Sequence, residues 1–172
     1  WATPIPRPGQ PSLRGLEYWP GDGATPPRLF FGTRDGRLIA LDAGTGAFAA
    51  SFGDGGVVQL ATEGILQGGD ARFYGMTSPP IVYRNLVITG AAVQEYPQRG
   101  MSGDVRAWDV ITGKLVWTFH TVPQEGELGN ETWEQESWRY TGNTNVWTVM
   151  SADPELGYVY LPTSGATNDM YG

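Results

Sequence analysis

The feature that most constrains the fold is a short unit that occurs twice in the chain. Residues 35–52 read DGRLIALDAGTGAFAASF, and residues 102–119 read SGDVRAWDVITGKLVWTF. Aligned without gaps, the copies share the pairs Gly36/Gly103, Ala40/Ala107, Asp42/Asp109, Thr45/Thr112, Gly46/Gly113 and Phe52/Phe119. In both copies an alternating strand ends in Asp, a Thr-Gly turn reverses the chain, and an apolar strand returns. The Asp side chain can accept hydrogen bonds from the N–H groups of the turn, and the Gly supplies the positive φ that such turns need.

Alternating apolar segments elsewhere predict more antiparallel strands around the two copies. We expect strands at about residues 28–33, 36–43, 47–52, 81–93, 103–110, 114–121, 146–152 and 157–163. Units of antiparallel strands that recur after tens of residues are typical of β-propeller blades or of a β-solenoid. A propeller closes with about four to eight blades, which is more than this chain holds, so the chain is predicted to be part of a longer protein.

These patterns predict an all-β fold, namely a partial β-propeller of consecutive antiparallel four-stranded blades. Residues 1–172 are expected to be a fragment of one propeller domain, with two blade repeats at roughly 24–119 and the start of the next blade at 146–172. The long polar stretch 121–145 contains two tryptophans and a tyrosine, and this aromatic content disfavours disorder. We predict that this stretch is an ordered cap loop over one end of the propeller.

Composition narrows the classes of partner and site. The formal net charge is −7 and the Lys and Arg residues are scattered, so nucleic-acid binding is not expected. The chain has no cysteine, which excludes disulfides and cysteine-ligated metals within it. No apolar run approaches about 18 residues, so any membrane anchor is expected in segments outside this chain, as is any targeting signal.

Three segments of the chain carry recognisable motifs, at residues 14–26, 103–117 and 144–162. The first reads RGLEYWPGDGATP and closely resembles the alcohol dehydrogenases that depend on pyrroloquinoline quinone (PQQ), which belong to the family of quinoprotein alcohol and glucose dehydrogenases. Residues 103–117, GDVRAWDVITGKLVW, resemble the membrane-bound glucose dehydrogenases, and residues 144–162, TNVWTVMSADPELGYVYLP, resemble both. The matches run in the family's order across nearly the whole chain.

The resemblance implies an eight-bladed propeller that holds PQQ near its axis together with a calcium ion. Arg14 matches a family arginine that contacts the cofactor, and Thr77 matches a hydroxyl that bonds a cofactor carboxylate. Trp147 matches the tryptophan that stacks on one face of the PQQ ring, and Ala92 is small enough to let the cofactor approach. Glu95 matches the calcium-ligating glutamate, in keeping with the hard oxygen ligands that calcium takes. These residues are far apart in sequence and are expected to converge at one end of the blades.

Two parts of the family's site are not found in this chain. The family often places an Asn calcium ligand after the YLP-type strand, but Gly165 occupies the matching position, so that Ser164, Asn168 or the Gly165 carbonyl would have to substitute. The catalytic Asp of the family is expected downstream of the chain, which therefore holds no catalytic residue of its own. His120 matches no family site and is expected to be a strand-end residue.

The implied function is the oxidation of a primary alcohol or a glucose-type aldose by hydride transfer to the quinone. The downstream Asp would abstract the hydroxyl proton while calcium polarises the quinone carbonyl, and electrons would pass to a cytochrome or ubiquinone. This chemistry implies a periplasmic protein, in some members attached to the inner membrane, and the fragment by itself is expected to be inactive. The alternative is a non-catalytic propeller scaffold of the outer-membrane assembly type, which would share the repeated turns but would have no use for Arg14 or Glu95.

Overall fold

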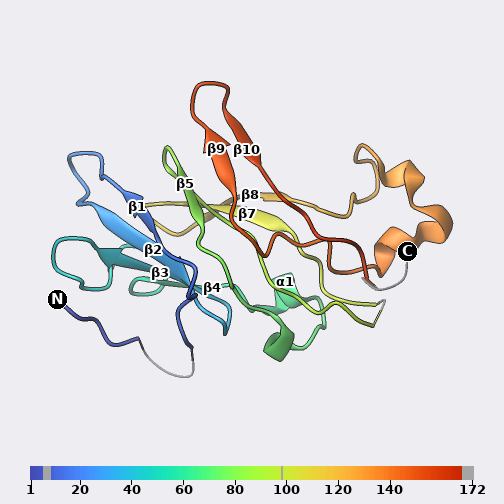
Figure 1. The fold of residues 1–172 in the computed structure, drawn as a ribbon, viewed down its shortest axis with the longest axis horizontal. Coiled ribbons are helices and arrows are strands. Elements are labelled where there is room, and N and C mark those ends of the chain that lie inside the picture. The colour runs from blue at the N-terminus through green and yellow to red at the C-terminus, as the bar shows by residue number, and fades with distance from the viewer. Residues whose placement is uncertain (6–8, 98, 168–172) are drawn as a thin grey trace.

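The computed structural model describes residues 1–5, 9–97 and 99–167, which form two four-stranded antiparallel sheets and a two-stranded ribbon (Figure 1). The first sheet, in the order β1-β2-β3-β4, contains β1 (Glu17–Trp19), β2 (Arg28–Gly32), β3 (Arg37–Asp42) and β4 (Val57–Gln59). The second, in the order β5-β6-β7-β8, contains β5 (Ile81–Tyr83), β6 (Leu86–Thr89), β7 (Val105–Asp109) and β8 (Leu115–Phe119). The ribbon pairs β9 (Ser151–Asp153) with β10 (Tyr158–Tyr160). The all-β prediction is confirmed.

The helices are short and lie in the connections between strands. They are α1 (Glu63–Leu66) and the 3₁₀ turns η1 (Ala71–Phe73), η2 (Asn130–Thr132) and η3 (Glu134–Arg139). Within the described ranges, none of them has the length and apolarity that crossing a bilayer requires.

The two copies of the repeated turn have the same hydrogen bonds. Asp42 Oδ1 accepts from the N–H and the hydroxyl of Thr45 at 2.7 and 2.8 Å. Asp109 Oδ1 accepts from the same two groups of Thr112, also at 2.7 and 2.8 Å. The glycine after each threonine has a positive φ, of 76° in the first copy and 70° in the second. The turn predicted from the duplicated sequence is therefore confirmed.

One predicted strand, 47–52, does not form. This segment pairs with β3 only through an isolated bridge between Leu41 and Phe48, and the strand that completes the sheet is β4. The Phe52 ring is fully buried and lies 5.4 Å from the Phe30 ring, centroid to centroid, so the chain turns into the core at this point. Three glycines with positive φ between Phe52 and β4 then reverse the chain, and the ladder resumes only after them.

The predicted strand 81–93 is two strands instead of one. β5 and β6 form a tight hairpin, in which Arg84 adopts a left-handed conformation with φ of 54°. The chain leaves the sheet after Thr89 and returns to it at β7, and the described residues between them, 90–97 and 99–104, belong to a loop. The first sheet begins at Glu17, upstream of the boundary near residue 24 that the repeat indicates.

The two sheets pack face to face over the largest apolar core. Its fully buried side chains include Phe30, Leu38 and Phe52 from the first sheet and its connection, and Val87 and Val110 from the second. A buried arginine of β2 ties the two sheets together, because Arg28 Nη1 donates to the carbonyl oxygens of Val110 and Ile111 at 2.6 and 2.8 Å. A second apolar cluster, which includes Ile88, Val105 and Val146, joins the second sheet to the β9–β10 ribbon.

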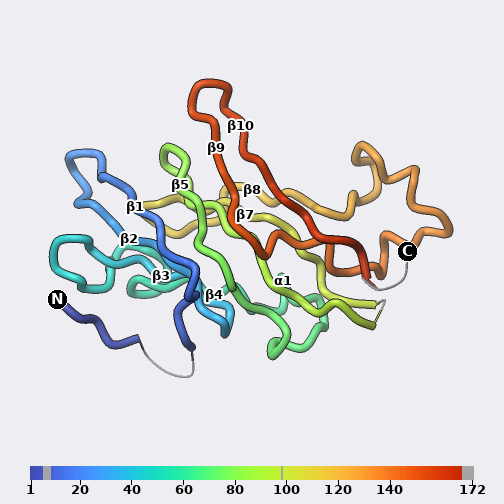
Figure 2. The backbone as a smooth tube through the Cα atoms, viewed as in Figure 1, coloured from blue at the N-terminus to red at the C-terminus, as the bar shows by residue number. Residues whose placement is uncertain are grey.

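The leading strands of the three sheets lie side by side. β1 contacts β5, and β5 contacts β9, so the chain advances from one sheet to the next in the same sense, as the blue-to-red tube of Figure 2 shows. This is the arrangement expected of adjacent propeller blades, in which the first strand of each blade lies toward the axis. The segments that precede β1, β5 and β9 consequently arrive at the same end of the sheets.

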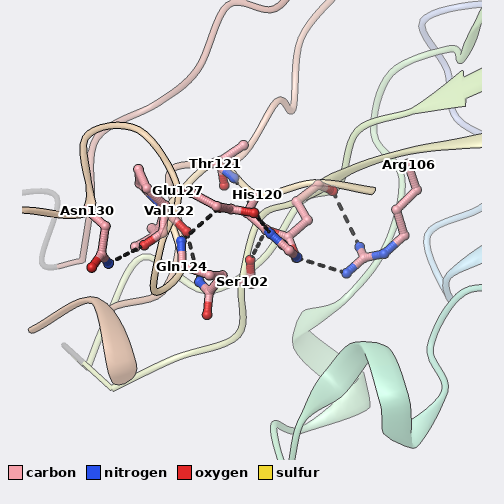
Figure 3. Close-up of polar contacts among 10 residues, drawn as sticks. Ser102, Arg106, His120, Thr121, Val122, Gln124, Glu127 and Asn130 are labelled. Atoms are coloured by element: carbon pink, nitrogen blue, oxygen red, sulfur yellow. Dashed lines mark hydrogen bonds and ion pairs between the residues drawn. The ribbon is translucent and has the colours of Figure 1, made fainter. Parts of the chain in front are cut away.

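The stretch 121–145, predicted to be a cap loop, is held at its start by a polar network (Figure 3). His120 Nδ1 lies 2.8 Å from Glu127 Oε1, and the other carboxylate oxygen of Glu127 accepts from the N–H of Gln124 at 2.8 Å. These contacts lower the pKa of Glu127, chiefly through the Gln124 N–H. Asp104, which forms a buried ion pair with Arg106 at 3.1 Å, accepts a hydrogen bond from the N–H of Thr121. His120 therefore anchors a loop at the end of β8, and the role of that loop as a cap stays a prediction.

Candidate functional site

A cavity of about 270 Å³ opens at the end of the sheets where β1, β5 and β9 begin. Its wall comes from five stretches of the chain: before β1, before β5, after β6, before β9 and after β10. The lining residues are Arg14, Thr77, Ala92, Val93, Glu95, Asn143, Asn145, Trp147 and Ser164. All five residues that the sequence assigned to a cofactor or metal site line this one cavity. Their convergence is confirmed, and their individual roles stay predictions.

Close backbone packing holds the loop after β6 against the segment before β9. Asn145 Nδ2 donates to the carbonyl oxygen of Ala91 at 2.7 Å, and this amide is buried. On the other side of the loop, Ala92 and Gly75 exchange two backbone hydrogen bonds of 2.8 and 3.0 Å. The approach depends on Gly90, because a Cβ there would lie 2.1 Å from the carbonyl oxygen of Val146. The loop that carries Ala92 and Glu95 is thus placed directly beside Trp147.

Replacing Gly90 by Ala in the full-length protein is expected to lower the free energy of unfolding by about 1–3 kcal/mol, because backbone atoms must move to admit the methyl group. Urea unfolding followed by tryptophan fluorescence measures this loss. Gly64→Ala is the matched control, since a Cβ there meets nothing within 4 Å and Ala is the better residue in α1. Equal stability of the two variants would contradict the close approach at Gly90.

The backbone of Trp147 is fixed while its ring stays accessible. Its carbonyl oxygen accepts hydrogen bonds from Arg14 Nη1 at 3.1 Å, from Thr77 Oγ1 at 3.1 Å and from the Ser78 hydroxyl. The Arg14 guanidinium carbon lies 4.8 Å from the centroid of the Trp147 ring, in a cation–π contact. The residue nevertheless keeps 44% of its surface exposed. A flat aromatic surface in a cavity wall can cover one face of a planar ligand.

Arg14 gives the cavity a positively charged end. Its Nη1 is used by Trp147 and by the Ser78 hydroxyl, 3.2 Å away. No contact joins its Nε or Nη2 to any residue of the described ranges, so this edge of the guanidinium remains available for a ligand. A planar pair of N–H donors is suited to a carboxylate.

Glu95 and Asn143 give the cavity an oxygen-rich end. Glu95 is exposed and has no hydrogen bond or ion pair with any residue that the structure describes. Asn143 is 1% exposed, and its Oδ1 is a buried acceptor without a donor among the described residues. Unpaired buried acceptors are rare, and a cation removes their cost. These oxygens therefore fit a hard divalent cation, although no group of three or more acidic, His or Cys side chains able to hold a metal occurs among the described residues.

The region of the missing family Asn forms hydrogen bonds with the segment before β9. The Gly165 carbonyl accepts from the N–H of Thr144 at 2.9 Å, and the Ser164 hydroxyl donates to Asn145 Oδ1 at 2.5 Å. Asn168 lies outside the described residues. The sequence analysis did not identify Asn143. The signal that could have found it is its position between Gly142 and Thr144, four residues before Trp147. Asn is a residue type that tolerates positive φ and offers a ligand oxygen.

The comparisons with known proteins agree on one family. The family described as the glucose/ethanol/alcohol dehydrogenase β-propeller domain, under the name PQQ, matches residues 3–172. The quinate/shikimate dehydrogenase (quinone) of Acinetobacter baylyi is 36% identical over 174 residues, which cover 95% of this chain and 20% of that protein. The quinohemoprotein alcohol dehydrogenase ADH IIB of Pseudomonas putida is 37% identical over 164 residues, which cover 90% of this chain and 21% of that protein.

Solved structures give the same result. The quinohemoprotein alcohol dehydrogenase ADHIIG of Pseudomonas putida HK5 superposes with a TM-score of 0.66 at 27% identity, over 91% of this chain and 21% of that chain. A europium-containing methanol dehydrogenase superposes with a TM-score of 0.60 at 28% identity, over 90% of this chain and 26% of that chain. The chain spans about a fifth of the length of the curated relatives it matches. It belongs to the family of PQQ-dependent quinoprotein alcohol and glucose dehydrogenases, and it forms part of their β-propeller domain.

Proposed function

We propose that the full-length protein is a PQQ- and calcium-dependent dehydrogenase that oxidises a primary alcohol or an aldose. The observation that carries the proposal is the cavity in which an unshared edge of Arg14, the exposed ring of Trp147 and the unpaired carboxylate of Glu95 lie together.

The cavity wall offers the two kinds of partner that PQQ needs. PQQ is a flat tricarboxylate, so its carboxylates need cationic or hydroxyl donors and its ring needs a flat apolar neighbour. Arg14 Nε and Nη2 are donors without a partner in the cavity wall, the Thr77 hydroxyl could donate to a ligand by turning away from the Trp147 carbonyl, and the Trp147 indole is the flat surface. Ala92, whose side chain ends at Cβ, leaves room for a ligand at its part of the wall.

Glu95 is the residue that would hold calcium. Its carboxylate is a hard ligand and carries the charge that a divalent cation must balance. When bound, calcium supplies a Lewis acid beside the quinone, and PQQ supplies the hydride acceptor. The residues of the cavity wall would position both groups, and the base that removes the substrate proton would come from a segment outside the described residues.

The substrate class and the electron acceptor belong to the same proposal. The relatives are named as dehydrogenases of alcohols, glucose, glycerol and quinate, so the family supports oxidation of a hydroxyl group and does not select one substrate. One relative, the methanol dehydrogenase subunit 1 of Paracoccus denitrificans, carries cytochrome c in its name. A cytochrome or ubiquinone as acceptor, and a periplasmic location, follow as proposals from this chemistry.

Reconstitution of the metal-free full-length protein tests the proposal. PQQ and calcium are added separately and together, and the reduction of an artificial electron-accepting dye is followed with ethanol, glycerol and glucose as donors. We expect turnover with at least one donor only when PQQ and calcium are both present. A protein that binds neither PQQ nor calcium would be a non-catalytic propeller scaffold, and the proposal would be wrong.

A further inference from the structure

Asn143 is the most deeply buried polar residue of the cavity wall, and the proposed function gives it no role. Its exposed fraction is 1%, and its Oδ1 has no hydrogen-bond donor among the described residues. Glu95, on the opposite loop, is the other oxygen ligand of the wall without a partner. An amide carbonyl oxygen and a carboxylate are both ligands that calcium takes from proteins.

The neighbouring oxygen atoms, unlike Asn143 Oδ1, already have a hydrogen-bond partner. Asn145 uses both ends of its amide, since Nδ2 donates to the Ala91 carbonyl at 2.7 Å and Oδ1 accepts from the Ser164 hydroxyl at 2.5 Å. The Gly165 carbonyl accepts from the N–H of Thr144 at 2.9 Å. Asn145 and Ser164 therefore position the wall, and Asn143 is the buried wall residue whose side-chain oxygen has no donor among the described residues.

The backbone around Asn143 is held in a conformation that most residues avoid. Asn143 has φ of 62° and Thr144, a β-branched residue, has φ of 53°. Two consecutive left-handed residues cost free energy, and such strain collects at ligand sites, where the surrounding structure imposes it. Two ladder-like contacts impose it here, because the Asn143 N–H donates to Met101 O and the Gly103 N–H donates to Asn143 O, each at 3.0 Å.

Gly103 allows the chain to approach closely enough for these two backbone hydrogen bonds. A Cβ at that position would lie 2.4 Å from the Cα of Asn145 and 2.5 Å from the carbonyl oxygen of Asn143. The segment that forms these hydrogen bonds is itself held to the second sheet. Ser102 donates to the carboxylate of Asp104, which is paired with Arg106 of β7. Asn143 is thus presented to the cavity by a rigid support, as a ligand must be if it is to select a metal.

We propose that Asn143 Oδ1 is the second protein ligand of the divalent cation held by Glu95. This inference rests on the proposed function, and it assigns to Asn143 the ligand that position 165 does not supply as a side chain. The pair joins the loop after β6 to the segment before β9, so the cation would also fix the distance between the Glu95 loop and Trp147.

The test is calorimetric titration of metal-free full-length protein with calcium alone, which needs no turnover. Asn143→Gly keeps the positive φ and removes the amide, and it is expected to raise the Kd for calcium at least about tenfold, since even the loss of a group that supports a ligand costs that much. Asn143→Asp keeps the shape and adds a charge, and it is expected to lower the Kd. Asn130→Gly is the control with unchanged Kd, because its amide donates to Pro123 O in the 121–145 stretch and does not line the cavity.

Each outcome decides a different point. If wild-type protein binds no calcium, both the metal in the proposed function and this inference are wrong. If Glu95→Gln weakens binding and Asn143→Gly leaves it unchanged, only the assignment of Asn143 is wrong. Circular dichroism verifies that each variant is folded, and if Asn143→Gly does not fold, an unchanged or higher Kd in Asn143→Asp overturns the assignment.

Discussion

Replacing Glu95 by Gln in the full-length protein is expected to raise the calcium concentration needed for reconstitution with PQQ by about a hundredfold or more. The change removes a formal charge from the cation ligand and keeps the shape of the side chain. Turnover at ordinary calcium should therefore fall by orders of magnitude, whereas the free energy of unfolding should change little, because Glu95 has no hydrogen bond or ion pair with the described residues to lose. Dye-reduction rates across a calcium series, with urea unfolding in parallel, measure both quantities.

Glu17→Gln is the matched control for this result. Glu17 lies in β1 and does not line the cavity, and burial raises its pKa because it disfavours the charged form. Removing that charge should leave the calcium requirement unchanged. If Glu95→Gln reconstituted at the wild-type calcium concentration with normal turnover, Glu95 would be an ordinary loop carboxylate and the cation would have to be held by other residues.

Replacing Arg14 by Ala is expected to weaken PQQ binding by about a hundredfold. The variant loses charge-assisted hydrogen bonds from Nε and Nη2 to a ligand carboxylate, worth about 1.5–3 kcal/mol each. It also loses the contacts of Nη1 with Ser78 and with the Trp147 carbonyl, so the indole is held less firmly. Titration of the calcium-loaded full-length protein with PQQ, followed by quenching of tryptophan fluorescence, gives the Kd.

Two further variants show whether the effect belongs to the guanidinium. Arg14→Lys keeps the charge without the planar pair of donors and should recover only part of the affinity. Arg72→Ala removes an exposed arginine that pairs with Asp70 at 2.5 Å, and it should bind PQQ as the wild type does. A fully wild-type Kd in Arg14→Ala would mean that the cofactor carboxylates are bound by other groups.

The outcome for the fold shows which signals in the sequence are local. Asp42 and Asp109 each accept a hydrogen bond from the Thr three residues later. Because the turn forms between neighbours in the chain, it could be predicted from the sequence. The predicted strand 47–52 failed because Phe52 is taken up by a core that includes Phe30 from another strand. The predicted strand 81–93 failed because its apolar residues belong to a hairpin and a loop, which apolar pattern by itself does not separate.

The candidate site divides in the same way. Arg14, Thr77, Glu95 and Trp147 were predicted from segments that resemble the family, and they line one cavity. Asn143 belonged to no matched motif, and it became visible only through its burial, its unpaired oxygen and its positive φ. The sequence offered only an Asn in a polar stretch, which is most often a solvated loop residue.

The sequence by itself determined the repeated Asp-Thr-Gly turn, the family, and a set of residues that line one cavity. These depend on contacts within a few residues or on motifs that stand whole in the chain. Only the tertiary structure decided how the loop after β6 meets the segment before β9, through Gly90 against Val146 and Gly103 against Asn145. That meeting depends on the packing of two sheets whose residues are far apart in the chain. An oxygen atom is free to bind a metal when no hydrogen-bond donor of the folded chain reaches it. The set of such oxygens is therefore a property of the assembled fold.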